Sequence, residues 1–334
     1  MMRFLPNNRK ESRIKNTSIA DIILLAAICI SVVSCSSVPK EIAIAGIFDR
    51  FEKTPHVILR SGDIFLRDIA ACLDDSTIQA IETIASDKSN ESEKKKEPSK
   101  PIDHANIDKL LTRAQVVGIG VSLTETGQPA LEAVFAGNFP DLLTSLSFSL
   151  DSNWKKINGG YALKSGSLYV RNPNQGQVHL ATWVPPASPI TNPGASALAA
   201  KGGVLANAMD FAIYIDAKST IVSQLPIMEG VTLPFEGILM SAIREKTSPP
   251  KGDPSAMYRT TFQIRMKDEQ SARTYKPIVR FLWVMLSSKL SSYGIAISPE
   301  IAIEQQGSIF ISQPVMISAR QLVDVGLSIS TFDN

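Results

Sequence analysis

Histidines are the side chains that most often combine with acids in metal sites and in acid–base catalysis. The chain has three of them, His56, His104 and His179, and they are far apart in the sequence. None belongs to an HExxH motif or stands at metal-ligand spacing from a cysteine or an acid. His179 alternates with Val178 and Leu180 in a predicted strand, which favours a structural or surface role. We therefore predict no metal ion and no cofactor.

Nucleophile and nucleotide motifs are equally weak. The SxxK pattern occurs at 37–40, 92–95 and 152–155, but neither SDN nor KTG accompanies it. The GIG sequence at 118–120 has no third glycine and lies inside a predicted strand, so it does not match a dinucleotide-binding loop. These observations predict no catalytic residue.

Acidic pairs and one tryptophan are the remaining candidates. Asp49 with Glu52, and Asp74 with Asp75, could supply paired carboxylates, but both pairs flank predicted turns and helix starts, where acids stabilise the helix dipole. Trp183 stands next to a proline-rich segment and could line a ligand cleft between two modules. It is the candidate for a ligand-contacting residue.

Cys35 follows a segment typical of an export signal. Five basic residues precede an apolar run of twelve residues, 22–33, which is shorter than the roughly 20 residues of a transmembrane helix. The run ends in Val32-Val33-Ser34-Cys35, which resembles the lipobox of bacterial lipoproteins in the relaxed form found in spirochaetes. The resemblance implies that residues 1–34 are removed, that Cys35 carries the lipid, and that Ser36 is compatible with outer-membrane sorting. The alternative is an uncleaved signal anchor, in which Cys35 has no role.

Composition limits the rest of the chain. Residues 35–334 carry 29 basic and 30 acidic residues, a balance that does not predict nucleic-acid binding. With Cys29 in the signal and Cys35 lipidated, Cys72 would be the remaining cysteine, and its apolar surroundings favour a buried, unreactive thiol.

Hydrophobic periodicity predicts the elements that must position these residues. In the first half we expect a helix over 61–73, another over 75–86, a solvated charged loop at 87–103 and a helix beginning near Pro140. In the second half we expect a short helix at 219–225 and a longer one at 274–294, with Pro277 in the first turn of the longer helix. We expect a third helix to begin after a cap at Ser318. The expected strands are 56–60, 115–124, 129–137, 160–165, 167–172, 177–183, 210–217, 235–245, 256–266, 300–306 and 307–315.

Each half therefore has the order β-α-β-β-α-β-β, which predicts an α+β protein of two tandem ferredoxin-like modules with antiparallel sheets. The expected organisation is a signal peptide at 1–34, a tether at 35–55, a first module at 56–183, a linker at 184–209 and a second module at 210–334.

The function predicted from these features is that of a lipid-anchored cell-envelope protein, on the outer or inner membrane, that binds an envelope protein or ligand without catalysis. A solute-binding lipoprotein is one alternative, although such proteins mostly have parallel sheets. An envelope hydrolase is the other, and it would require a histidine to meet an acid and a serine in space.

Overall fold

The computed structural model describes residues 46–74, 113–123, 129–164, 168–171, 176–184, 186, 192–206, 209–217, 234–295, 297 and 303–330. The signal peptide with Cys35, His104, Asp75, the charged loop at 87–103 and the helices expected at 75–86 and 219–225 lie outside these ranges.

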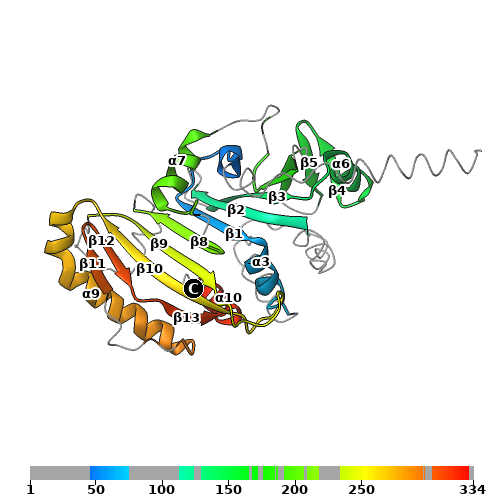
Figure 1. The fold of residues 1–334 in the computed structure, drawn as a ribbon. Helices are drawn as coiled ribbons and strands as arrows, with labels where there is room; N and C mark the ends of the chain where they lie inside the picture. Colours follow the sequence, from blue (N-terminus) through cyan, green and yellow to red (C-terminus); the bar gives the residue numbers. More distant parts are fainter. Residues whose placement is uncertain are drawn as a thin grey trace, which may run out of the picture.

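Within the described ranges the strands form one antiparallel sheet of thirteen strands, in the order β11-β12-β10-β9-β8-β1-β2-β3-β7-β6-β5-β4, with β13 also paired to β10 (Figure 1). Alternating or continuous apolar residues let most of these strands bury at least one face, and β4 is an exception with no buried residue. The strands are β1 (Val57–Gly62), β2 (Ala114–Leu123), β3 (Pro129–Gly137), β4 (Trp154–Ile157), β5 (Gly160–Leu163), β6 (Tyr169–Arg171), β7 (Gln177–Ala181), β8 (Phe211–Asp216), β9 (Phe235–Arg244), β10 (Met257–Met266), β11 (Ile303–Gln306), β12 (Ile309–Ser312) and β13 (Val315–Ser318).

Helices lie at several places along this sheet (Figure 1). Helix α9 packs on β10, β11 and β12 at one end, and α6 contacts β4 at the other. The short η1 and α7 contact each other near the middle, where α7 packs on β8 and β9. None of the helices in the described ranges has the length and hydropathy of a membrane span. Their bounds are η1 (Phe48–Arg50), α3 (Asp63–Ala70), α6 (Asp141–Leu150), α7 (Pro193–Gly202), α9 (Glu269–Ser292) and α10 (Ala319–Ser330).

The predicted α+β class with an antiparallel sheet is confirmed, but two separate ferredoxin-like modules are not. Strands β1 and β8, from different halves, pair directly, with Val57 opposite Ile215. Strand β1 is also the antiparallel neighbour of β2, so the first β-α-β segment is not a parallel βαβ unit. An open edge on each half would expose unpaired N–H and C=O groups, and the β1–β8 pairing removes both edges.

The second part of the expected tether is folded into the core. Ile47, Phe48 and Phe51 are fully buried. The GIG sequence of β2 makes room for them: a Cβ at Gly118 would lie 2.9 Å from the Phe48 ring, and one at Gly120 would lie 2.5 Å from the Phe51 ring. The glycines at 118 and 120 therefore let an aromatic segment approach the sheet closely.

The expected linker at 184–209 contains helix α7. Asn192 caps it by accepting a hydrogen bond from the Gly194 N–H at 2.9 Å, and Pro193 follows at the first helical position. Gly203 ends the helix in the left-handed conformation, with φ of 74°. The proline that we assigned to a linker thus begins a helix, and Ala195 and Ala199 of α7 are fully buried.

Local boundaries agree closely with the sequence periodicity in most strands, and two differences are informative. Strand β4 was not predicted, because WKKI has little apolar content. Pro277 lies inside α9 rather than in its first turn, since Asp268 caps the helix earlier by accepting from the Ser271 N–H at 2.7 Å. The predicted Ser318 cap is confirmed by a 3.2 Å hydrogen bond from the Gln321 N–H to the Ser318 hydroxyl.

Candidate functional site

Two buried polar residues share one face of the sheet on neighbouring strands. In the β3–β7 pairing, Glu132 lies opposite Ala181 and Val134 lies opposite His179. Glu132 and His179 are therefore diagonal neighbours on the same face, a spacing that long side chains can span. The His179 Nε2 atom lies 2.7 Å from Oε1 of Glu132.

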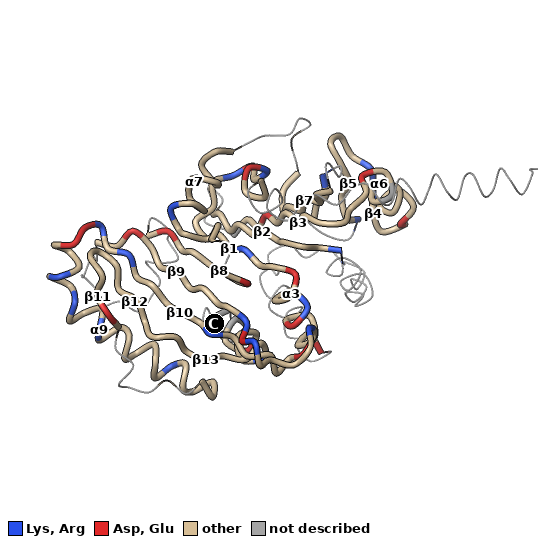
Figure 2. The backbone as a smooth tube through the Cα atoms, in the orientation of Figure 1, with Lys and Arg blue, Asp and Glu red and all other residues tan. Residues whose placement is uncertain are grey.

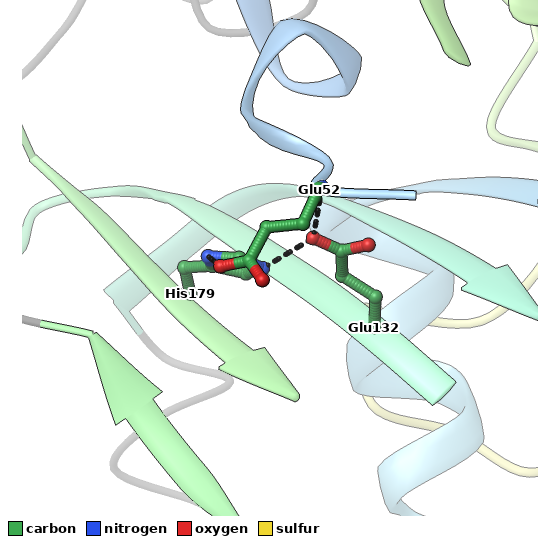
Figure 3. Close-up of side chains that lie close together, drawn as sticks. All are labelled: Glu52, Glu132 and His179. Atoms are coloured by element: carbon green, nitrogen blue, oxygen red, sulfur yellow. Dashed lines mark hydrogen bonds and ion pairs between the residues drawn. The ribbon is translucent and has the colours of Figure 1, made fainter. Parts of the chain in front are cut away.

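The segment after η1 brings a second carboxylate to this face. Phe51 packs against Gly120, and Gly120 lies opposite Glu132 in the β2–β3 pairing. The next residue, Glu52, donates its backbone N–H to Oε1 of Glu132 at 2.6 Å. Its own carboxylate lies 4.0 Å from His179 Nδ1. Figure 3 shows the three side chains directed toward one another from the η1 segment and two strands.

Arg171 and Trp183 bind the Glu52 carboxylate from the other side. Both Nε and Nη2 of Arg171 donate to Oε1 of Glu52, the first at 2.5 Å. Trp183 Nε1 donates to Oε2 at 2.7 Å, and the Lys53 ammonium lies 4.2 Å from the centre of the Trp183 ring. Trp183, predicted to line a ligand cleft, therefore orients Glu52.

We call Glu52, Glu132 and His179 the two-Glu–His cluster. Their side chains are 4%, 3% and 7% exposed, and one ligand atom from each lies within 4.8 Å of the others. The His179 Nε2 atom contacts Glu132 but makes no hydrogen bond, because hydrogen bonds need alignment as well as proximity. The cluster therefore holds a buried ring nitrogen beside two carboxylates.

A second buried carboxylate provides a contrast. Asp68 is fully buried and accepts four hydrogen bonds. The donors are Arg244 Nε and Tyr258 OH on Oδ2, both at 2.7 Å, and the Gly252 and Asp253 N–H groups on Oδ1, at 2.6 and 3.3 Å. Burial and the hydrogen bond to Asp68 raise the pKa of Tyr258, so the phenol remains a donor. Asp68 thus forms an ion pair with one guanidinium, that of Arg244, and the lone pairs of its carboxylate are occupied by hydrogen bonds. This arrangement is typical of a structural site.

The other predicted candidates lie outside both clusters. Asp49 accepts a hydrogen bond from the Ser196 hydroxyl of α7, and Asp74 accepts from Arg320 at 2.8 Å. Cys72 is buried, as predicted, and burial raises the pKa of its thiol to about 11. His56 donates its backbone N–H to Val121. In the described part of the chain, no hydrogen bond or ion pair joins His179 to a serine.

Sequence reasoning missed Glu132 and Arg171, although Glu132 left a signal. In the PALEAVFAG strand, Glu132 falls on the same alternating face as Ala130, Val134 and Ala136, all of which are buried. An acid on an apolar face is rarely buried without a partner. Nothing in the sequence indicates that His179, 47 residues later, is that partner.

Two helices expose apolar side chains. On α6, Leu142, Leu146 and Leu150 are 66%, 45% and 82% exposed, and their spacing of four residues places them in one line along the helix. On α9, the exposed apolar residues are Phe281, Val284, Met285 and Leu286.

Charged residues surround α6. Lys155 and Lys156 on β4 are exposed, and β4 contacts α6. Figure 2 shows both basic and acidic segments beside α6 and β4, with Asp141 at the start of the helix and Asp151 at its end. The Phe148 ring of α6 packs edge-on against Trp154 of β4, with 5.0 Å between the centroids, so helix and strand form one unit.

No family model and no curated protein matches the chain. Similar solved structures include crystal form III of TP0453, which is 15% identical over 84% of this chain and 98% of that one, with a TM-score of 0.45. Crystal form I is 16% identical over 89% and 100%, with a TM-score of 0.44, and crystal form IV is 15% identical over 90% and 99%, with a TM-score of 0.43.

Proposed function

We propose that this protein is a non-catalytic cell-envelope protein, held by lipid on Cys35, that rests helix α6 on the surface of the membrane carrying the anchor. The observation that carries the proposal is the line of exposed leucines at 142, 146 and 150. Scattered exposed leucines are common in soluble proteins, but three in one line form a contiguous apolar strip that favours an apolar partner.

The composition around α6 suits a membrane surface. An interfacial helix buries its apolar face at the boundary between headgroups and acyl chains, while nearby cations attract anionic lipids. The leucines supply the apolar face, and Lys156, on the same side of β4 as Trp154 and α6, supplies a cation. A lipid chain on Cys35 would add to this contact, since one acyl chain alone gives only marginal binding.

The route of the chain leaves α6 within reach of the anchor. Eleven residues lead from Cys35 to Gly46, a reach of about 36 Å when extended. The chain then joins the sheet at Glu52, which binds Arg171 of β6 and Glu132 of β3. From β6 the sheet continues through β5 to β4 and α6, whereas α9 lies at the opposite end. With strands about 4.8 Å apart, α6 is well within reach of an anchored tether.

Metabolic labelling with a clickable fatty acid tests the anchor. The wild-type chain should take up the label and have a mature mass that begins at Cys35, and Cys35→Ala should take up none. An unlabelled wild-type chain that retains residues 1–34 would contradict the anchor and would support an uncleaved signal anchor.

Vesicle flotation tests the contact surface separately. The full chain with Leu142→Ser, Leu146→Ser and Leu150→Ser should bind vesicles of phosphatidylcholine and phosphatidylglycerol much more weakly than wild type, because it loses the apolar strip. The matched control carries Phe281→Ser, Val284→Ser and Met285→Ser on α9. Both variants have the same N-terminus, so a difference between them reports the helix alone. Loss of binding only in the α9 variant would overturn the assignment to α6.

A further inference from the structure

We propose that the two-Glu–His cluster is a binding site for a divalent transition-metal ion, with zinc as the best match. The inference goes beyond the membrane role and does not depend on it. The ligands would be one imidazole nitrogen of His179 and one carboxylate oxygen each from Glu52 and Glu132. One imidazole with two carboxylates is a ligand set that suits zinc and similar divalent ions.

The hydrogen bonds leave ligand atoms available. A carboxylate can accept about four hydrogen bonds. Arg171 occupies Oε1 of Glu52, but among the described residues Oε2 accepts from Trp183 alone. Oε1 of Glu132 accepts from the Glu52 N–H, and Oε2 accepts from the Lys53 N–H at 3.4 Å. His179 Nε2, in a side chain that is only 7% exposed, makes no hydrogen bond. Glu52 and Glu132 therefore each have unused lone pairs beside the buried imidazole, whose Nε2 atom lies 2.7 Å from Oε1 of Glu132.

The charges favour a bound cation. Two carboxylates face one guanidinium, that of Arg171, whose side chain is 12% exposed, and the Lys53 ammonium lies over the Trp183 ring. The Asp68 site differs because one carboxylate faces one guanidinium and four donors fill its oxygens. Metal binding requires a neutral imidazole, and with His179 neutral the two carboxylates carry more charge than Arg171 balances, so a divalent ion would compensate the remainder.

Arg171 and Trp183 would act as supporting residues. Carboxylates that bind metals are themselves hydrogen-bonded, and these outer contacts fix their orientation. Arg171 and Trp183 hold Glu52 in this way through hydrogen bonds to both of its carboxylate oxygens. Glu52 belongs to the folded second part of the tether. A bound ion would therefore join this part of the chain to β3 and β7.

Calorimetric titration of the purified full chain with zinc tests the site. We expect one equivalent to bind, with at least a tenfold loss of affinity in His179→Gln and in Glu132→Gln. His56→Gln and Glu304→Gln make the same chemical changes outside the cluster and should leave the affinity unchanged. Absence of binding to wild type, or an equal loss in the control variants, would overturn the proposal.

X-ray absorption of the zinc-loaded wild-type chain identifies the atoms bound to the ion. It needs no variant, so it tests the site even if a cluster variant fails to fold. A single imidazole and oxygen ligands at about 2.0–2.2 Å are expected in the first shell. A shell without imidazole, or one containing sulfur, would overturn the assignment.

Discussion

Helices α6 and α7 each contain ten residues, yet they use their apolar side chains in opposite ways. Helix α7 presents small residues to the core, where Ala195 and Ala199 are fully buried and Gly202 lies against Tyr214. Helix α6 leaves three leucines exposed in a line. The apolar surface of α7 therefore stabilises the fold, whereas most of that on α6 remains free for contact with another surface.

The difference follows from what each helix packs against. Small residues let α7 approach the sheet closely, and the N-terminal segment also contacts it through η1. Helix α6 contacts the short strand β4 at the end of the sheet and packs there mainly through Phe148, beside Trp154 and Tyr161. The leucines lie on another side of the helix from Phe148 and remain exposed.

Gly202→Ala on α7 should have the largest effect on stability. A Cβ at Gly202 would lie 2.5 Å from Cγ of the buried Tyr214 ring, so the helix or the ring must shift. We expect a loss of about 1–3 kcal/mol in the free energy of unfolding. Urea denaturation measures it, with Ser145→Ala on α6 as the control, expected within about 0.5 kcal/mol of wild type. Equal stability of the two variants would contradict the close packing of α7.

Lys155→Gln with Lys156→Gln should have the next largest effect, on membrane binding. Each lysine near an anionic surface contributes about 1 kcal/mol, and the contribution decreases as salt shortens the screening length. Co-sedimentation with phosphatidylglycerol-containing vesicles should show a clear loss of binding at low salt and little difference at high salt. A loss that does not change with salt would show that the lysines act by another route.

The α6 leucine variant used for flotation should change stability very little. Exposed side chains contribute little to folding, so the free energy of unfolding should stay within about 0.5 kcal/mol of wild type. Thermal and urea unfolding check this expectation. A large destabilisation would mean that the leucines are core residues, and the contrast between α6 and α7 would then fail.

Cys72 should be nearly inert toward alkylation in the native protein. Burial raises the pKa of the thiol from its ordinary value of 9.0 to about 11, so the thiol stays protonated at pH 8 and the thiolate appears only as the pH approaches 11. Maleimide labelling followed by mass determination should find little modification of Cys72 at pH 8. Rapid labelling there would show that this part of the core opens readily.

Local patterns in the sequence predicted most strands and the Ser318 cap, because alternation and capping depend on near neighbours. The joining of both halves into one sheet depends on β1 meeting β8, more than 140 residues later, and no local signal specifies that register. Helix α7 was missed because its capping asparagine and first proline stand in a segment otherwise typical of a linker.

The two-Glu–His cluster shows the same limit at the level of chemistry. Glu52 comes from the segment after η1, Glu132 from β3 and His179 from β7. Their spacing in the sequence therefore resembles no motif. The buried acid in an apolar strand, Glu132, was a usable signal that a partner had to exist. Its partners could be identified only from the pairing of the strands and the packing of Phe51 on Gly120.

Depth-dependent quenching tests the membrane role of α6 most directly. A fluorophore is attached through Leu146→Cys on α6, and a matched one through Ala197→Cys at an exposed position on α7, in full chains bound to vesicles whose lipids carry quenchers at known depths. The account predicts strong quenching of the α6 probe by quenchers near the headgroup–acyl boundary and little quenching of the α7 probe. An α6 probe that remains as unquenched as the α7 probe would contradict the membrane contact.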